Sequence, residues 1–324
     1  MLILNDLAGV DAQSILRPSP VEPGASELVI VWEETRFGGS LSLDNFGTRF
    51  LGPLEATATG VANNLYRQYD STELRGLVTA QIEELQYLAL RHSVPITPEG
   101  TLLALEGSYT WSEPQELGEL RGIDTDGRSA FGALLLTHPL IRTRARNLSL
   151  FGGFRAQNSD NRLLGTTTSR DRTRVLTAGA TFDLVDRFDG VTLFGVDVVQ
   201  GLDILGARDG ESDPPPSRPD ADPNFTRLAA SIIREQDLGG NVSLRVALSG
   251  QYAFDPLVAS EQYGIGGEIF GRGYGPFEIA GDHGLAGKIQ LQYGRPWQFD
   301  RLADVIESYL AYVFYDAGVV WQKN

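Results

Sequence analysis

The sequence contains no cysteine and only a little histidine and lysine. Without cysteine the chain can form neither disulfides nor thiolate metal sites, and it has no cysteine nucleophile. The three histidines, His92, His138 and His283, are scattered and leave little material for a zinc centre. Lysine occurs only at Lys288 and Lys323, so almost every cation is an arginine. We therefore expect no bound metal and no cofactor.

Positive charge is scarce and long apolar runs are missing. The 324 residues include 27 Lys+Arg against 42 Asp+Glu, a formal net charge of -15. Binding to a phosphate backbone needs an excess of cations, so we exclude nucleic acid as a partner. No stretch approaches the ~18–20 apolar residues of a transmembrane helix, and the first residues do not form a signal peptide. This leaves either a cytoplasmic protein or a chain whose true start is missing.

What the sequence has in quantity is alternation of apolar and polar residues from Arg36 onward. In the segment 241–254, nearly all even positions are apolar and most odd positions are polar, which is typical of a strand with one apolar face. We predict thirteen strands at 37–46, 54–63, 73–82, 84–94, 101–111, 120–137, 146–158, 170–184, 191–203, 225–235, 241–254, 283–294 and 306–320.

Two architectures fit this pattern, a soluble β-sandwich and a transmembrane β-barrel. Most predicted strands reach the ~9–11 residues that cross the hydrocarbon of a membrane, whereas ordinary strands have ~5–6 residues. Aromatic residues such as Trp111, Tyr252 and Trp321 lie at strand ends, where the interfacial girdles of a barrel are found. The pattern therefore favours the barrel.

The first 34 residues do not share this regular alternation of apolar and polar residues. Residues 2–9 are consistent with the end of an amphipathic helix, and residues 12–16 and 27–32 with two short strands separated by proline and glycine. This is half of a small α+β module, with too little apolar surface to fold alone.

A glycine-rich stretch at 268–287 interrupts the alternation and joins two strong strands, so we predict a long loop there. Within it, Gly271-Arg272-Gly273-Tyr274 resembles the Val-Arg-Gly-Tyr/Phe signature of the haemolysin secretion/activation proteins. These are the outer-membrane translocation pores of two-partner secretion (TpsB, ShlB/FhaC type), relatives of the barrel-assembly factor BamA. Gly271 departs from the family pattern, which has valine there, and we expect some loss of packing.

Three further stretches are similar to the same family, in the same order. Phe314-Tyr315-Asp316-Ala317-Gly318 resembles its Phe-x-Asp-x-Gly strand motif. Residues 42–47 resemble the opening barrel strand, and residues 2–10 resemble the helix end of the second polypeptide-transport-associated (POTRA) domain.

The resemblance implies an all-β fold, a transmembrane antiparallel β-barrel preceded by part of an α+β POTRA domain. Residues 1–34 would be the C-terminal remnant of the POTRA domain and residues 35–324 the barrel. The family has sixteen strands, so about thirteen here imply a chain truncated at both ends, with an unpaired edge at the last strand.

The resemblance also implies that the loop around Arg272 folds back into the barrel and pairs with Asp316. Strand parity supports this independently, because Val313, Tyr315 and Val319 form one apolar face and Asp316 lies on the other. The predicted site residues are Gly271, Arg272, Gly273, Tyr274, Phe314, Asp316 and Gly318. Two unrelated charges are the alternative, and Tyr274 is either packed in the lumen or at a loop tip.

The implied function is export of an unfolded exoprotein across the outer membrane of a Gram-negative bacterium, by a monomeric, non-enzymatic pore in contact with lipid. The alternatives are a BamA-like insertase, a passive porin and a soluble β-sandwich enzyme or lectin. We expect His283 to be a solvated loop residue and residues 206–224 to be a flexible, solvent-exposed acidic loop. We expect Arg142, Arg144 and Arg146 to be charges at the periplasmic rim.

Overall fold

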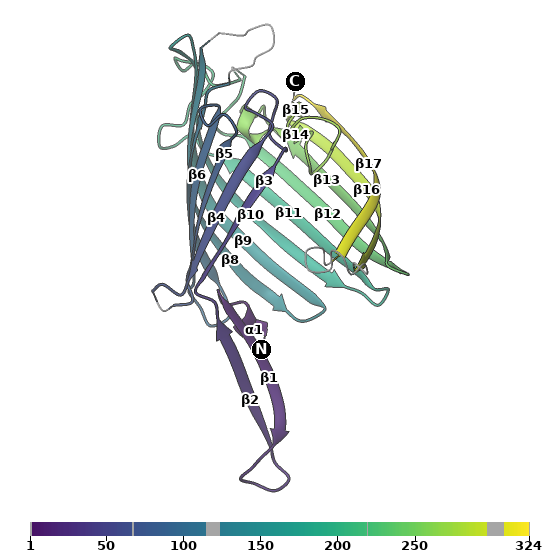
Figure 1. Cartoon of the computed structure of the whole chain (residues 1–324). Coiled ribbons are helices and arrows are strands. Elements are labelled where there is room, and N and C mark those ends of the chain that lie inside the picture. The colour runs from purple at the N-terminus through teal and green to yellow at the C-terminus, as the bar shows by residue number, and fades with distance from the viewer. Residues whose placement is uncertain (1, 67, 115–123, 219, 297–307, 324) are drawn as a thin grey trace.

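The computed structural model describes residues 2–66, 68–114, 124–218, 220–296 and 308–323. Its main feature is an antiparallel sheet of thirteen strands in which nearly every strand pairs with its neighbours in sequence (Figure 1). The strands are β3 (Phe37–Asp44), β4 (Glu55–Asn63), β5 (Ser71–Thr79), β6 (Leu85–Pro95), β7 (Leu102–Ser112), β8 (Thr125–Arg142), β9 (Arg146–Leu163), β10 (Thr166–Val185), β11 (Gly190–Gly201), β12 (Thr226–Gly239), β13 (Val242–Ala253), β16 (His283–Pro296) and β17 (Ser308–Trp321). The sheet curls strongly, with β3 and β17 at its two edges.

The thirteen predicted strands are confirmed, and their ends differ mainly in β8, which continues past residue 137 to Arg142, and in β9 and β10, which both extend toward the turn that joins them. These strands have 18, 18 and 20 residues and extend past the predicted limits. The residues 159–162 added to β9 and 166–169 added to β10 are polar on both faces, so no alternation indicated them. The predicted starts at 120 and 306 fall on residues outside the described ranges.

The outer face of the sheet is apolar and exposed. Leu134, Leu176 and Leu248, on three different strands, are each 47–50% exposed. The total accessible surface is 19997 Å², whereas a globular monomer of 35.3 kDa has about 13,000 Å². The sheet therefore does not bury its apolar face within this chain, as expected for a barrel whose outside contacts lipid.

No helix in the described part of the chain has the length and hydropathy needed to cross a membrane.

The N-terminal residues form a separate hairpin that projects from one end of the sheet (Figure 1). It consists of a short helix, α1 (Leu2–Asn5), and the paired strands β1 (Val10–Pro18) and β2 (Ser26–Glu34). The predicted strands are therefore present and longer than expected. A hydrogen bond from the Arg142 Nε to the Asp6 carboxylate (2.8 Å) ties the hairpin to the turn after β8. Arg142 is thus a rim charge with a specific partner, on the end of the barrel that carries the hairpin.

The prediction of a solvent-exposed acidic loop at 206–224 is wrong for part of that loop. Pro216 and Ala221 are buried, and Arg218 donates a hydrogen bond to the carbonyl oxygen of Leu257 (2.7 Å). The composition is polar, but the loop folds against the segment that joins β13 to β16, which it contacts through Ser217 and Arg218.

Candidate functional site

The candidate site is built on the loop that joins β13 to β16, residues 254–282, which we name the long loop. It contains a short 3-10 helix, η2 (Ala259–Glu261), and two three-residue strands that pair with each other, β14 (Tyr263–Ile265) and β15 (Ile279–Gly281). The predicted long loop is present, and the two short strands within it were not predicted because alternation over three residues is too short to detect. Its side chains contact the inward-facing residues of the wall.

Arg272, near the tip of the long loop, forms a bidentate ion pair with Asp316 of β17. The Arg272 Nε lies 3.0 Å from Asp316 Oδ2, and Nη2 lies 2.9 Å from Oδ1. The side chains are only 15% and 4% exposed. The planar guanidinium matches both carboxylate oxygens, which makes this arrangement both strong and specific in direction. The structure thus brings together the two charges that the sequence singled out.

The backbone of the long loop adds two more hydrogen bonds to the same carboxylate. The N–H groups of Gly271 and Arg272 both donate to Asp316 Oδ2, at 3.2 Å. Gly271 has a φ of +89°, a conformation that a residue with a β-carbon rarely adopts. Glycine at this position therefore permits the turn that aims both N–H groups at Asp316.

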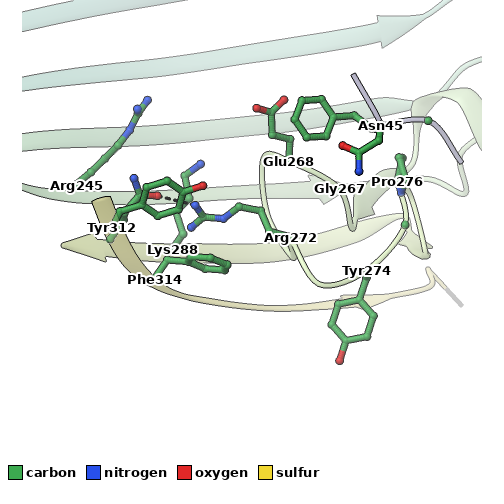
Figure 2. A pocket seen from close by; sticks show the side chains of 14 residues that line it. Asn45, Arg245, Gly267, Glu268, Arg272, Tyr274, Pro276, Lys288, Tyr312 and Phe314 are labelled. Carbon is green, nitrogen blue, oxygen red and sulfur yellow. Dashed lines mark hydrogen bonds between the residues drawn. The ribbon is translucent and has the colours of Figure 1, made fainter. Parts of the chain in front are cut away.

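The aromatic residues of β17 complete the surroundings of the Arg272 guanidinium (Figure 2). Its carbon Cζ lies 3.5 Å from the ring centre of Phe314 and 5.7 Å from that of Tyr312, a cation–π arrangement. The remaining nitrogen, Nη1, donates to Gln290 Oε1 on β16 at 2.6 Å. All the contacts hold the arginine against the wall, which indicates anchoring rather than chemistry.

Gly318, two residues after Asp316 on β17, is a second point at which the long loop contacts the wall. A β-carbon there would lie 2.6 Å from Ile265 Cδ1 of β14 and 3.0 Å from the Ala286 β-carbon. The absence of a side chain lets β14 press against β17. Of the other predicted residues, Gly273 has no atom within 4 Å of where a β-carbon would be, and Tyr274 is 70% exposed and points away from Arg272 (Figure 2).

A second ion cluster, which the sequence did not reveal, holds the start of the long loop. Glu261 of η2 is 5% exposed and accepts from Arg227 Nε of β12 at 3.1 Å and from Arg155 Nη2 of β9 at 3.4 Å. Asp197 of β11 lies 3.5 Å from Arg227. Nothing in the sequence indicated this cluster, because its four residues lie on four elements that are 30 or more residues apart in sequence. Only the curled sheet brings them together.

A third cluster surrounds Asp282, at the end of the long loop. Its fully buried carboxylate accepts from Arg218 and from the N–H groups of Leu257 (3.1 Å) and Lys323 (2.9 Å). Burial alone would raise the pKa of Asp282, but Arg218 and the two N–H groups hold that pKa below its usual range. The carboxylate thereby links the 206–224 loop, the long loop and the C-terminal end of β17.

The expectation of a solvated His283 is wrong. This residue begins β16, is 4% exposed, and its Nδ1 accepts a hydrogen bond from the N–H of Ala253 at 3.2 Å. Its ring stacks on Trp321, with 5.4 Å between ring centres. The neighbouring glycine and aspartate indicated a loop, whereas the packing of the long loop over β13 and β16 buries the ring.

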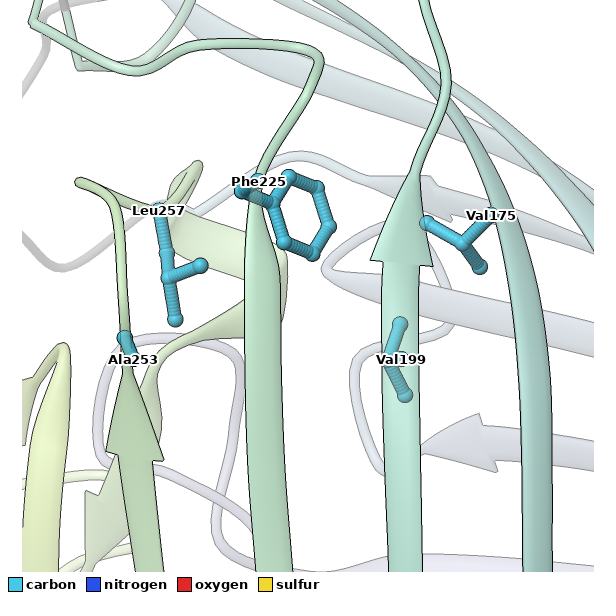
Figure 3. Close-up of a cluster of buried hydrophobic side chains, with 5 residues drawn as sticks. All are labelled: Val175, Val199, Phe225, Ala253 and Leu257. Atoms are coloured by element: carbon cyan, nitrogen blue, oxygen red, sulfur yellow. The ribbon is translucent and has the colours of Figure 1, made fainter.

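A small apolar cluster packs the long loop against the ends of β10 to β13 that lie away from the N-terminal hairpin (Figure 3). It contains Val175, Val199, Phe225, Ala253 and Leu257, none more than 1% exposed. Leu257 comes from the long loop and the others from the wall or its ends, so the loop contributes to the only hydrophobic cluster found among the described residues.

A cavity of about 620 Å³ lies beside the Arg272–Asp316 pair. Its lining includes Lys288 of β16, Arg245 of β13 and Asn45 from the loop after β3 (Figure 2). Phe46, the residue after Asn45, also lines it. The opening-strand segment at 42–47 therefore meets the Arg-Gly-Tyr segment across the interior, although the two lie more than 220 residues apart in sequence.

Comparison with known proteins agrees with this geometry. A family model described as haemolysin secretion/activation protein ShlB/FhaC/HecB matches residues 24–324. The heme/hemopexin transporter protein HuxB of Haemophilus influenzae strain 86-028NP is 25% identical over 300 residues, 91% of this chain and 52% of that protein. HuxB of strain KW20 Rd is 26% identical over 301 residues. The chain spans about half the length of the curated relatives it matches.

Solved structures support the same fold. CdiB from Escherichia coli has a TM-score of 0.77 and 21% identity, over 92% of this chain and 55% of CdiB. BamA from Haemophilus ducreyi lacking POTRA domains 1-3 has a TM-score of 0.60 and 12% identity, over 98% of this chain and 64% of that one. Since the family model covers nearly the whole sequence and the fold agrees, the chain belongs to the haemolysin secretion/activation protein family ShlB/FhaC/HecB.

Proposed function

We propose that this protein exports a large partner exoprotein, in unfolded form, through its barrel and across the outer membrane. The observation that carries the proposal is the long loop, anchored on the interior wall by the Arg272–Asp316 pair in a member of a secretion family. A loop held there by charge and hydrogen bonds occupies the path of a polypeptide and defines where that path can open. Family membership supports the transport class, since its model describes secretion and activation of haemolysins.

The partner is a secreted protein rather than a small solute. This proposal is supported by the family model, which describes haemolysin secretion, and by the relative HuxB, which is named a heme/hemopexin transporter. The chain carries no nucleotide-binding motif in its sequence, so we propose that folding of the exoprotein outside the cell pulls the equilibrium toward export.

Residues 1–34 are proposed to be the end of a POTRA domain in the periplasm, with the barrel beginning at residue 35. Leu28, Val31 and Trp32 of β2 are 49–60% exposed, which supports packing against further parts of such a domain. An exposed strand edge in that domain would capture extended polypeptide through backbone hydrogen bonds with little demand on its sequence. The long loop then lies toward the cell exterior, at the opposite end of the barrel (Figure 1).

The experiment is deletion of the gene in its native bacterium, followed by complementation. We expect a large exoprotein to disappear from the medium and to accumulate in or be degraded in the periplasm, while the other outer-membrane proteins keep their levels. A general loss of outer-membrane proteins would instead support an insertase, and a defect in small-solute uptake alone would support a porin. Either result would overturn the proposal.

A further inference from the structure

The outer face of the barrel carries a dense group of arginines at the end where the long loop lies. Strands β8, β9 and β10 pair so that Arg128, Asp160 and Arg170 form one row across the sheet. Arg172 and Arg174 follow in the next two rows of β10. We name the outward residues Asp126, Arg128, Asp160, Arg162, Arg170, Arg172 and Arg174 the arginine face.

Strand parity places these side chains on the outside. Arg174 has the same parity as Leu176, which is 48% exposed on the apolar outer surface. The opposite parity includes Arg155, whose side chain contacts Glu261 of the long loop in the interior. The arginine face is therefore on the outer side of the sheet, although Arg174 itself is only 8% exposed.

The charges in this face do not cancel. Asp160 Oδ1 accepts from both Arg170 (2.9 Å) and Arg172 (2.8 Å), so two guanidinium groups share one carboxylate. Arg174 donates to neutral oxygens, including Asn158 Oδ1 at 2.9 Å. Five arginines stand against two aspartates, in a protein whose net charge is -15. The side chains of Arg128, Arg170 and Arg172 are 50%, 34% and 20% exposed, so an external anion can reach them.

An apolar hollow begins directly below the arginines. It has a volume of about 600 Å³. Its lining includes Leu134, Leu136, Phe154, Leu176, Ala178 and Val198. Gly152 leaves its floor open, since a β-carbon there would meet only the Thr177 carbonyl oxygen, at an ordinary 3.5 Å. Leu176 lies two residues from Arg174, about 7 Å along the strand.

The position along the barrel matches a membrane boundary. The apolar outward residues of β10 run from Leu176 to Leu184, about 27 Å of strand. With the usual tilt of about 40°, this length spans roughly 20 Å of the ~25 Å apolar band of an outer-membrane barrel. The arginines thus begin where lipid headgroups begin, and the hollow lies where acyl chains lie.

We propose that the arginine face and the hollow below it form a binding site for a phosphorylated, multiply acylated lipid of the outer leaflet. The phosphates contact Arg128, Arg170 and Arg172, and one acyl chain fills the hollow over Gly152. Charge complementarity favours this occupant, because the arginines match its phosphates and the neighbouring apolar hollow matches an acyl chain. A protein partner would not need these two features in adjacent rows of the sheet. The site goes beyond the proposed export function, and its occupancy is read without any secretion assay.

The test is binding of bis-phosphorylated lipid A to the purified protein in detergent, measured by native mass spectrometry or fluorescence. The combined variant Arg128→Gln, Arg170→Gln, Arg172→Gln should bind at least about tenfold more weakly, since each cation near a headgroup contributes substantially. The matched control removes the same charge from the opposite rim, through Arg144→Gln, Arg146→Gln and Arg187→Gln, and should bind as the wild type does. Lipid A without phosphates should bind the wild type as weakly as the first variant.

Two single variants keep the test decisive if the combined variant folds poorly. Asp160→Asn adds net positive charge to the face and should tighten binding about fivefold. Gly152→Leu fills the hollow and should weaken binding of lipid A while leaving the arginines in place. Equal loss in both combined variants, or unchanged binding in Asp160→Asn and Gly152→Leu, would overturn the proposal.

Discussion

Asp316 is the residue on which the interior arrangement depends. Its carboxylate accepts four hydrogen bonds, two from the Arg272 side chain and two from the backbone of Gly271 and Arg272. A buried carboxylate without such partners is costly, and a satisfied one fixes the orientation of the groups that contact it. Phe314 adds a cation–π contact from the same strand. A single strand of the wall thus specifies where the tip of the long loop lies.

The first prediction concerns the strength of the pair. Because both side chains are largely buried, Arg272→Gln should reduce the free energy of unfolding by about 3–5 kcal/mol, measured by urea unfolding in lipid. A double-mutant cycle with Asp316→Asn isolates the pairwise part. Glu278→Gln, an exposed position in the same loop, is the control and should change little. A cycle that shows no coupling between positions 272 and 316 would contradict the ion pair.

The second prediction concerns Gly318. Gly318→Ala places a methyl group 2.6 Å from Ile265 and should push β14 away from β17, which costs about 1–3 kcal/mol. Gly273→Ala, in the same site but with open space, should be close to neutral. The two variants are compared by the same unfolding measurement. Equal stability of the two would mean that the close contact between β14 and β17 does not exist.

At the scale of the element, the long loop is held at its start, its tip and its end. Glu261 anchors the start on β9 and β12, Arg272 the tip on β17, and Asp282 the end on the 206–224 loop. The anchors join the long loop to different elements. Opening a path for polypeptide therefore requires that at least one of them be released.

The third prediction tests the start of the loop. Glu261→Gln leaves Arg155 and Arg227 without this carboxylate. It should broaden the distribution of distances between spin labels attached at Glu211→Cys and Glu278→Cys. The absence of native cysteine makes this labelling specific. The same pair of labels in a protein with Glu268→Gln, a loop change outside the Glu261 cluster, should keep a narrow distribution. An unchanged distribution in Glu261→Gln would show that the cluster does not hold the loop.

The fourth prediction is a pH dependence at the end of the loop. The pKa of Asp282 is lower in the folded protein than in the unfolded chain, so its stabilising contribution is complete at neutral pH. It is lost as the pH falls below about 4 and the carboxylate takes up a proton. The label distance described above should therefore broaden on acidification. In Asp282→Asn the distribution of label distances should be broad already at neutral pH and should not change on acidification. A wild-type distribution that stays narrow at low pH would contradict the role of Asp282.

The strands were predictable and the anchors only partly so. Alternation with a period of two indicates strands in segments such as 241–254, because one face of the sheet is apolar and the other is polar. Parity also placed Asp316 on the inner face, and the motif suggested Arg272 as its partner. Glu261 and Asp282 gave no such signal, since their arginine partners lie in distant elements. His283 was misassigned because its burial depends on the long loop folding over it.

At the scale of the whole molecule, the thirteen-strand sheet has two edges in the described residues, β3 and β17. Closure with sixteen strands, as the family resemblance implies, stays a prediction, as does the POTRA assignment of residues 1–34. The segment after β3 nevertheless approaches the long loop across the interior, where Phe46 and Arg272 line one cavity. The curvature of the sheet thus encloses the site that we propose to govern export.

The most direct test of the account is secretion by the Arg272→Gln variant in the native bacterium. If the anchored tip of the long loop defines the export path, the secreted fraction of the exoprotein should fall about tenfold or more, since the pair is worth more than the 1.4 kcal/mol of a tenfold effect. The folded, heat-modifiable barrel should remain at its normal level, and Glu278→Gln should secrete normally. Secretion by Arg272→Gln at the wild-type level, from a correctly assembled barrel, would contradict the central claim.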